Sequence, residues 1–271
     1  MPELPEVETT RRGIEPHLLG HRIARLTVHN PHLRWPVPVG LENLVAGQSI
    51  HTVSRRGKYL LLELDTGTLL IHLGMSGSLR MTQPNDPLLK HDHIELVLDS
   101  GKQLRYCDPR RFGSWLWTDQ PPAAHPLLAQ LGPEPLGRDF TARYLFNSLQ
   151  GRKQAIKTLI MDSHLVVGVG NIYANEALFM AGIHPQRQGS MLDIGDCTRL
   201  VRQIKTVLKN AIHRGGTTLR DFVGGDGKAG YFAQELLVYG RANQPCKTCQ
   251  SPLQEIRLGQ RSTIFCLRCQ S

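Results

Sequence analysis

Residues 246–269 read CKTCQSPLQEIRLGQRSTIFCLRC and contain four of the six cysteines of this 271-residue chain. The spacing is C-x2-C, then sixteen residues, then C-x2-C. Each C-x2-C turn can hold two thiolates close together, and the segment between them can fold as a hairpin, as in a tetrahedral zinc ribbon. The alternatives are two disulfides or four unliganded thiols. The spacing and the expected cytosolic context favour zinc.

One zinc ion in this ribbon is expected to be structural. Sulfur ligands would fill all four coordination positions and leave none open for a catalytic water. The metal would fold a segment too short to bury a core of its own, and would hold Arg257, Arg261 and Arg268 on a rigid hairpin where they suit phosphates. The predicted ligands are Cys246, Cys249, Cys266 and Cys269.

The charge balance points to a polyanionic partner. Lys and Arg total 32 against 23 Asp and Glu, which gives a formal net charge of +9. This excess of positive charge favours nucleic acid over a small molecule as the binding partner. The most apolar long run, residues 165–183, contains Asn171, Asn175 and Glu176 and is therefore not a membrane span. Residues 1–8 are acidic and interrupted by proline, unlike a signal peptide. We therefore expect a cytoplasmic protein with reduced thiols and no membrane partner.

The first half of the chain has the pattern of a β-domain. Apolar residues recur with a period of two between residues 21 and 117, and residues 65–68 and 99–102 are turn sequences that separate apolar runs. This pattern predicts an antiparallel sandwich or barrel. A helix is expected ahead of it over residues 5–17, with Pro5 in its first turn.

The second half has a helical pattern. Residues 118–138 contain five prolines and predict a linker, and residues 140–214 are predicted to be mainly helices that end at Gly215–Gly216. The segment VVGVG at 166–170 interrupts two helical stretches and brings Asn171 to the start of the second. Residues 224–230, GGDGKAG, predict a loop that is either idle or closes over a ligand.

The N-terminal sequence MPELPEVE also suggests chemistry. Removal of Met1 would make Pro2 a secondary amine, which can attack an aldehyde-level carbon and form an iminium ion. Glu3 could then exchange protons with the substrate. The competing interpretation is that the acidic residues only stabilise the N-terminus of a helix.

A set of motifs spread over the whole chain resembles the bacterial formamidopyrimidine-DNA glycosylases. Their order, from the PELPEVE opening to the four-cysteine ribbon, is highly specific. The motifs are PELPEVETTRRGIEPHL (2–18), RRGKYLLLEL (55–64), HLGMSGSLR (72–80), KHDH (90–93), DPRRFGSW (108–115), VVGVGNIYANEALF (166–179), GGTTLRDF (215–222) and GYFAQELLVYGR (230–241).

The resemblance implies an α+β multidomain fold. It comprises an N-terminal helix and antiparallel β-sandwich over 1–130, a helix-two-turn-helix domain with a lesion-recognition loop over 131–236, and a zinc finger over 237–271. It also implies a bifunctional glycosylase and abasic-site lyase that excises 8-oxoguanine and formamidopyrimidines from double-stranded DNA. Such an enzyme is expected to act as a monomer in the bacterial cytoplasm.

The resemblance also assigns roles to residues. Pro2 would be the nucleophile and Glu3 the acid/base, with Lys58 and Arg261 serving β- and δ-elimination and contacting phosphates. The gap left by the flipped nucleotide would be filled by Met75, Arg110 and Phe112. The other matching DNA contacts are His91, Lys153 and Asn171, and residues 217–231 correspond to the loop over the oxidised purine.

Two alternatives remain at this stage. One is an endonuclease VIII-like glycosylase for oxidised pyrimidines, which the PELPEVE opening and the gap-filling trio disfavour. The other is a noncatalytic protein that binds damaged DNA, which predicts no covalent adduct. Trapping with borohydride separates the second from an enzyme.

Overall fold

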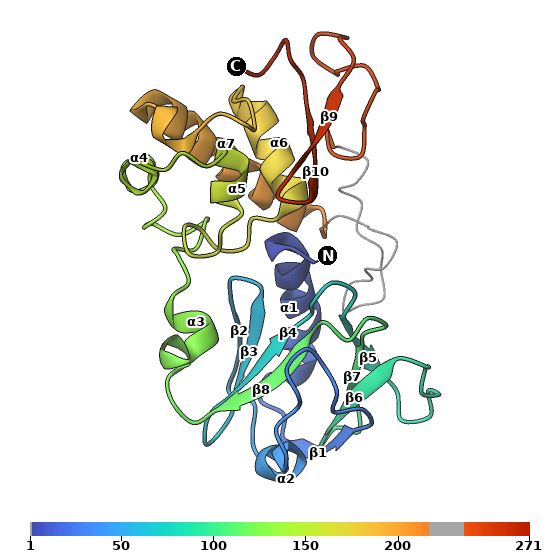
Figure 1. Ribbon diagram of the computed structural model, residues 1–271. Coiled ribbons are helices and arrows are strands. Elements are labelled where there is room, and N and C mark those ends of the chain that lie inside the picture. Colours follow the sequence, from blue (N-terminus) through green and yellow to red (C-terminus); the bar gives the residue numbers. More distant parts are fainter. Residues whose placement is uncertain (1, 217–235) are drawn as a thin grey trace. The chain divides into compact units, whose positions relative to one another are not determined.

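The structure, a computed structural model, describes residues 2–216 and 236–271. Contacts divide this part of the chain into two compact units, whose elements are labelled in Figure 1. The N-terminal unit contains residues 2–129 and 214–216. The C-terminal unit contains residues 130–213 and 236–271.

The N-terminal unit is built from one long helix and eight strands. The predicted helix is confirmed as α1 (Leu4–Leu18). The other elements are β1 (Ile23–Val28), α2 (Leu41–Val45), β2 (Thr52–Arg56), β3 (Tyr59–Glu63), β4 (Thr68–His72), β5 (Ser78–Thr82), β6 (Asp92–Leu98), β7 (Gln103–Cys107), β8 (Ser114–Thr118), a 3-10 turn (Pro122–Ala124) and α3 (Pro126–Ala129).

The strands form two four-stranded antiparallel sheets, which confirms the predicted sandwich. The orders are β1-β6-β7-β5 and β2-β3-β4-β8, and α1 contacts strands of both. Both expected hairpins are present, as β3–β4 and β6–β7. One core takes Leu60 and Trp115 from one sheet, Leu96 and Tyr106 from the other, and Ile14 from α1. This shared core supports the loops at the strand ends.

One detail differs from simple alternation. Glu95 on β6 is a charged residue in a strand with alternating apolar residues, yet it is only 7% exposed. Its carboxylate accepts a hydrogen bond from Arg105 Nε on β7 at 2.8 Å. A cross-strand ion pair therefore covers the second face of this sheet, so that β6 is buried on both sides.

The C-terminal unit contains four α-helices and the ribbon hairpin. Its elements are α4 (Ala142–Leu149), α5 (Ile156–Ile160), α6 (Asn171–Ala181), a 3-10 turn (Gly189–Met191), α7 (Ile194–His213), β9 (Gln254–Leu258) and β10 (Arg261–Phe265). Helix α7 buries an apolar stripe that includes Leu200, Ile204 and Leu208. Helix α6 begins at Asn171 as expected and contacts β10. No helix of the described residues is long and apolar enough to cross a membrane.

Candidate functional sites

The start of α1 buries Pro2 and Glu3. Glu3 is 1% exposed and is the N-cap residue of the helix, and its backbone N–H donates to Glu6 Oε2 at 2.9 Å. A Pro2 amine would therefore lie beside the positive end of the helix dipole, which disfavours its protonated form. The position of Glu3 is compatible with both hypotheses from the sequence, stabilisation of the helix N-terminus and acid/base catalysis, because a capping carboxylate can also transfer a proton.

One helical turn further, Glu8 ties α1 to the turn that carries Lys58. Its carboxylate pairs with Arg11 at 3.1 Å, Arg12 at 2.8 Å and Arg55 at 3.2 Å. Burial raises the pKa of Glu8, but the hydrogen bonds and charges of these guanidinium groups outweigh it and hold that pKa below its usual value. Arg55 also donates to the Gly57 carbonyl at 2.7 Å, so the two-residue turn before β3 is fixed with Lys58 in it.

Met75, Arg110 and Phe112 lie on two adjoining loops, residues 73–77 and 108–113, which we call the paired loops. The loops connect β4 to β5 and β7 to β8. Phe112 is 41% exposed, and the Arg110 guanidinium carbon lies 4.8 Å from the centroid of its ring. A Cβ atom on Gly74 would lie 2.4 Å from the Phe112 carbonyl carbon, so the two backbones touch. Sequence reasoning named the three side chains, and the structure brings their loops together.

His91 adjoins the second of the paired loops. Its carbonyl accepts the Asp108 N–H at 3.0 Å, and its half-buried ring lies 6.3 Å from the ring of His93. His93 is itself buried and bonds the Asp108 carbonyl through Nε2 at 2.8 Å. His91 therefore belongs to the same end of the sandwich as Arg110.

Lys153 and Asn171 lie on the C-terminal unit. Lys153 is exposed in the segment before α5, and Asn171 is the first residue of α6. The Asn171 Oδ1 atom is buried and has no hydrogen-bond partner among the described residues. Buried polar atoms are normally paired, so this amide has capacity left for a ligand.

The four ribbon cysteines form a compact cluster. Their Sγ atoms all lie within 4.8 Å of one another, with Cys246–Cys269 at 3.9 Å and Cys249–Cys266 at 3.4 Å. Tetrahedral zinc with bonds of about 2.3 Å requires sulfur separations of about 3.8 Å. All four positions can be filled by thiolate, so the cluster fits one structural zinc, as predicted.

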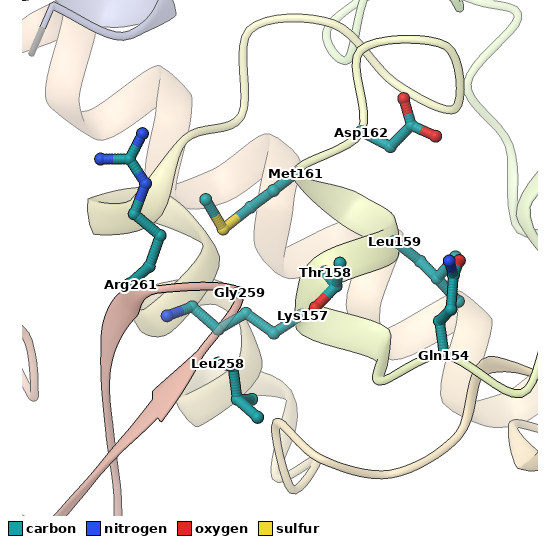
Figure 2. Close-up of a pocket in the computed structure, with 9 residues that line it drawn as sticks. All are labelled: Gln154, Lys157, Thr158, Leu159, Met161, Asp162, Leu258, Gly259 and Arg261. Atoms are coloured by element: carbon teal, nitrogen blue, oxygen red, sulfur yellow. The ribbon is translucent and has the colours of Figure 1, made fainter.

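A buried lysine that the sequence reasoning missed holds the ribbon hairpin. Lys157 of α5 is 1% exposed, and its ammonium donates to the Ser262 carbonyl at 2.8 Å and to Thr263 Oγ1 at 2.6 Å. Figure 2 shows Lys157 extending from α5 toward the hairpin turn at Gly259, beside a cavity of about 330 Å³ that Arg261 also lines. Arg261 is exposed at the start of β10 and is therefore accessible to phosphate.

Two features predicted from the sequence involve residues outside 2–216 and 236–271. The predicted loop over the oxidised purine, residues 217–231, and the glycine-rich segment within it lie outside the described residues. Met1, whose removal the Pro2 hypothesis requires, lies outside them too.

Known protein families match three parts of the chain. Residues 1–115 match the formamidopyrimidine-DNA glycosylase N-terminal domain, residues 131–223 the H2TH domain of the same glycosylase, and residues 243–271 the zinc finger found in FPG and IleRS. The match to the zinc finger agrees with the four-cysteine geometry.

Similar proteins cover the full chain. The formamidopyrimidine-DNA glycosylases of Stutzerimonas stutzeri and Thioalkalivibrio sulfidiphilus are 58% and 60% identical over 270 residues, which is 100% of both chains in each pair. The structure of MutM (Fpg) from Thermus thermophilus has a TM-score of 0.90 at 38% identity, covering 99% of this chain and 98% of that one. Lactococcus lactis Fpg in complex with abasic-site DNA has a TM-score of 0.91 at 34% identity, covering 99% of each chain.

Proposed function

The chain belongs to the formamidopyrimidine-DNA glycosylase family, and from this premise we propose that it excises 8-oxoguanine and formamidopyrimidines from duplex DNA through a Schiff base on Pro2. It is a bifunctional DNA glycosylase and abasic-site lyase of base excision repair. The observation that carries the proposal is the identity over the full chain to such glycosylases, together with Pro2 and Glu3 at the buried start of α1.

Pro2 and Glu3 would perform the first step. After loss of Met1, the Pro2 nitrogen attacks C1′ of the flipped nucleotide and the bond to the damaged base breaks. The electron pair of that bond leaves on the base, which takes up the proton that the Pro2 nitrogen releases. Glu3 protonates the sugar ring oxygen as the ring opens, which leaves an iminium ion between Pro2 and C1′. The helix dipole at the start of α1 helps to keep the attacking amine neutral.

Lys58 and Arg261 would act on the phosphates around the iminium ion. Loss of a C2′ proton expels the 3′ phosphate, and a second elimination expels the 5′ phosphate. A guanidinium is a poor proton donor, so we assign Arg261 to stabilising the departing phosphate charge. His91, Lys153 and Asn171 would hold the DNA backbone, and Met75, Arg110 and Phe112 would occupy the gap.

The zinc ribbon supports this site without taking part in a reaction step. Cys246, Cys249, Cys266 and Cys269 hold the metal, which supplies the folding free energy of the hairpin that carries Arg261. We further propose a cytoplasmic monomer whose affinity for DNA falls as salt rises, because the cationic side chains release counterions from the phosphates.

Borohydride trapping tests the nucleophile. Protein whose natural N-terminus is confirmed by mass spectrometry to be Pro2 should form a covalent adduct with 8-oxoguanine duplex, and a chain that keeps one residue before Pro2 should not. The matched variant Glu3→Gln should lose base excision yet still be trapped on DNA that already contains an abasic site. Excision at full speed by protein that retains Met1 would refute the mechanism.

The same assay addresses lesion class. A Lactococcus lactis Fpg that is 34% identical over 99% of each chain was solved with DNA containing an oxidised pyrimidine. Oxidised pyrimidine duplex should therefore be assayed beside 8-oxoguanine duplex. The proposal expects the higher kcat/KM on the purine, and the reverse order would favour an endonuclease VIII-like specificity.

A further inference from the structure

A single buried carboxylate connects the paired loops. Asp108 is fully buried at the start of the second loop. Its Oδ1 accepts from Ser76 Oγ at 2.6 Å and from the Arg110 N–H at 3.3 Å, and its Oδ2 accepts from Tyr106 Oη and from the Gly113 N–H, both at 2.9 Å. Four donors thus converge on one side chain, and they come from both loops and from β7.

The surrounding packing leaves this carboxylate little freedom. The Asp108 backbone is held at both polar groups, by the His91 carbonyl and by His93 Nε2. A Cβ atom on Gly113 would lie 1.8 Å from Tyr106 Oη, so only glycine permits the close approach. Ser76 Oγ also accepts from the Arg110 N–H at 3.2 Å, which links Met75's neighbour directly to a residue of the gap-filling trio.

We propose that Asp108 is a positioning residue that clamps the paired loops, so that Met75, Arg110 and Phe112 enter the DNA gap as one preassembled unit. The inference rests on the proposed function, because it assigns a task to the trio named there. Three side chains from two loops must fill one gap in the DNA. If the two loops became ordered only during binding, the entropy cost would lower the affinity for DNA. The clamp removes that cost before the DNA arrives.

The replacement Asp108→Asn tests the clamp with little change in shape. An amide presents donors where two of the four donors now point, so one side of the junction opens. The kcat/KM for 8-oxoguanine excision from duplex should fall about 10- to 100-fold. Borohydride trapping on single-stranded abasic DNA should be unchanged, because a single strand has no opposite base and no gap to fill.

Glu95→Gln is the matched control. It makes the same acid-to-amide change at a buried carboxylate of the sheet that contains β7, where Glu95 pairs with Arg105 and Arg25 and bonds neither of the paired loops. Any loss that comes only from a weakened sandwich should reduce duplex excision and single-strand trapping in parallel, and should appear in both variants. A 2-aminopurine beside the lesion gives a second readout, since its fluorescence rises as the base unstacks. Asp108→Asn should lower that rise and Glu95→Gln should not.

Ser76→Ala keeps the inference testable if Asp108→Asn does not fold. It removes the one side-chain donor that the first loop gives to the clamp, and it should lower duplex excision in the same selective way. Equal losses on duplex and single strand, or no loss in either clamp variant, would overturn the inference. Failure of the wild-type protein to be trapped would instead overturn the proposed function.

Discussion

The paired loops of the N-terminal unit and the ribbon of the C-terminal unit each carry exposed cationic side chains on a short segment. The paired loops stand on a sandwich core that is shared by two sheets and α1, and a buried carboxylate joins them. The ribbon contributes four of the six residues of a small buried cluster that also includes Phe179 of α6 and Val238, and two of those four, Cys246 and Cys266, are predicted ligands. Where a large core already stabilises the fold, hydrogen bonds are enough to fix the conformation of a loop. A segment with a small core needs a metal ion to fold.

Removal of zinc is expected to cause the largest loss of folding free energy. Structural zinc contributes about 10–16 kcal/mol in zinc-finger peptides, so a chelator or Cys249→Ala should unfold the ribbon and leave the sandwich folded. Calorimetry should then show the sandwich transition unchanged, and duplex affinity should collapse because Arg261 is no longer held.

Cys197→Ala is the control for this change. Cys197 is buried in α7 outside the four-cysteine cluster, so the variant should retain one zinc per chain, measured by release to a chromogenic chelator. A ribbon that keeps its fold and its DNA affinity without metal would remove the contrast with the paired loops.

Glu176 offers the counterpart of Asp108 in the C-terminal unit, with a smaller expected effect than zinc removal. It is 2% exposed on α6 and accepts the backbone N–H groups of Leu237, Val238 and Tyr239 at 2.8–2.9 Å. Burial raises its pKa, against the opposing effect of these donors. Glu176→Gln should cost about 2–3 kcal/mol of unfolding free energy, because the amide turns a donor toward donors.

This loss of unfolding free energy can be measured by urea unfolding, with zinc release as the signal. It should appear in the C-terminal unit, and the ratio of duplex to single-strand activity should fall less than in Asp108→Asn. A selective loss of duplex excision in Glu176→Gln, as large as that of Asp108→Asn, would mean that the two carboxylates do not serve separate regions.

The sequence predicted local features well. The C-x2-C turns place their thiolates close together through neighbouring residues alone. The first-turn proline predicted α1, and the periodicities predicted α7 and the antiparallel strands. These features depend on residues a few positions apart. They are therefore visible before the chain folds.

Features that depend on distant residues were not predictable. Ser76 is 32 residues from Asp108, and Lys157 is 105 residues from the Ser262 carbonyl that it bonds. The sequence around a charged residue in a short motif is the same whether its side chain is solvated or buried. Only the fold determines which hydrogen-bond donors surround it. DPRRFG therefore drew attention to Arg110 and Phe112, while the Asp108 that holds them passed unnoticed.

His72 gives the paired loops a pH dependence of intermediate size. The Gly74 N–H donates to His72 Nδ1 at 2.9 Å, which requires an unprotonated nitrogen. Burial, together with the charges of Lys58 and Arg34, lowers the pKa of His72 from 6.5 to about 4. Between these values the unfolded chain binds a proton that the folded chain does not, so stability is full above pH 6.5 and is lost as pH falls toward 4.

The loss should reach about 2 kcal/mol after allowance for the partial exposure of the ring. His72→Asn offers an amide oxygen to Gly74 without titrating, and its unfolding free energy should vary less with pH over that window. His32→Asn, at an exposed histidine, should keep the wild-type profile. Identical profiles for wild type and His72→Asn would exclude a linked proton at this turn.

Tyr106→Phe is the smallest and most selective change to the clamp. The variant keeps the buried ring, which packs against Trp115 with centroids 5.9 Å apart, and removes one of the four donors to Asp108. Burial and the neighbouring Asp108 raise the pKa of Tyr106 far above its usual value, so the hydroxyl remains a donor at every pH of interest. The expected cost is about 1.5 kcal/mol, because the lost bond has a carboxylate acceptor that keeps its three other donors.

Tyr144→Phe makes the same chemical change in the other unit, where the Tyr144 hydroxyl donates to the Leu165 carbonyl, also at 2.9 Å. Tyr106→Phe should lose somewhat more unfolding free energy than Tyr144→Phe, because the Tyr106 hydroxyl donates to a carboxylate and the Tyr144 hydroxyl to a neutral carbonyl. Only Tyr106→Phe should lower excision from duplex relative to trapping on a single strand, since only that hydroxyl belongs to the junction of the paired loops. An equal shift of this ratio in both variants would contradict the clamp, because the hydrogen bond of the Tyr144 hydroxyl lies outside the paired loops.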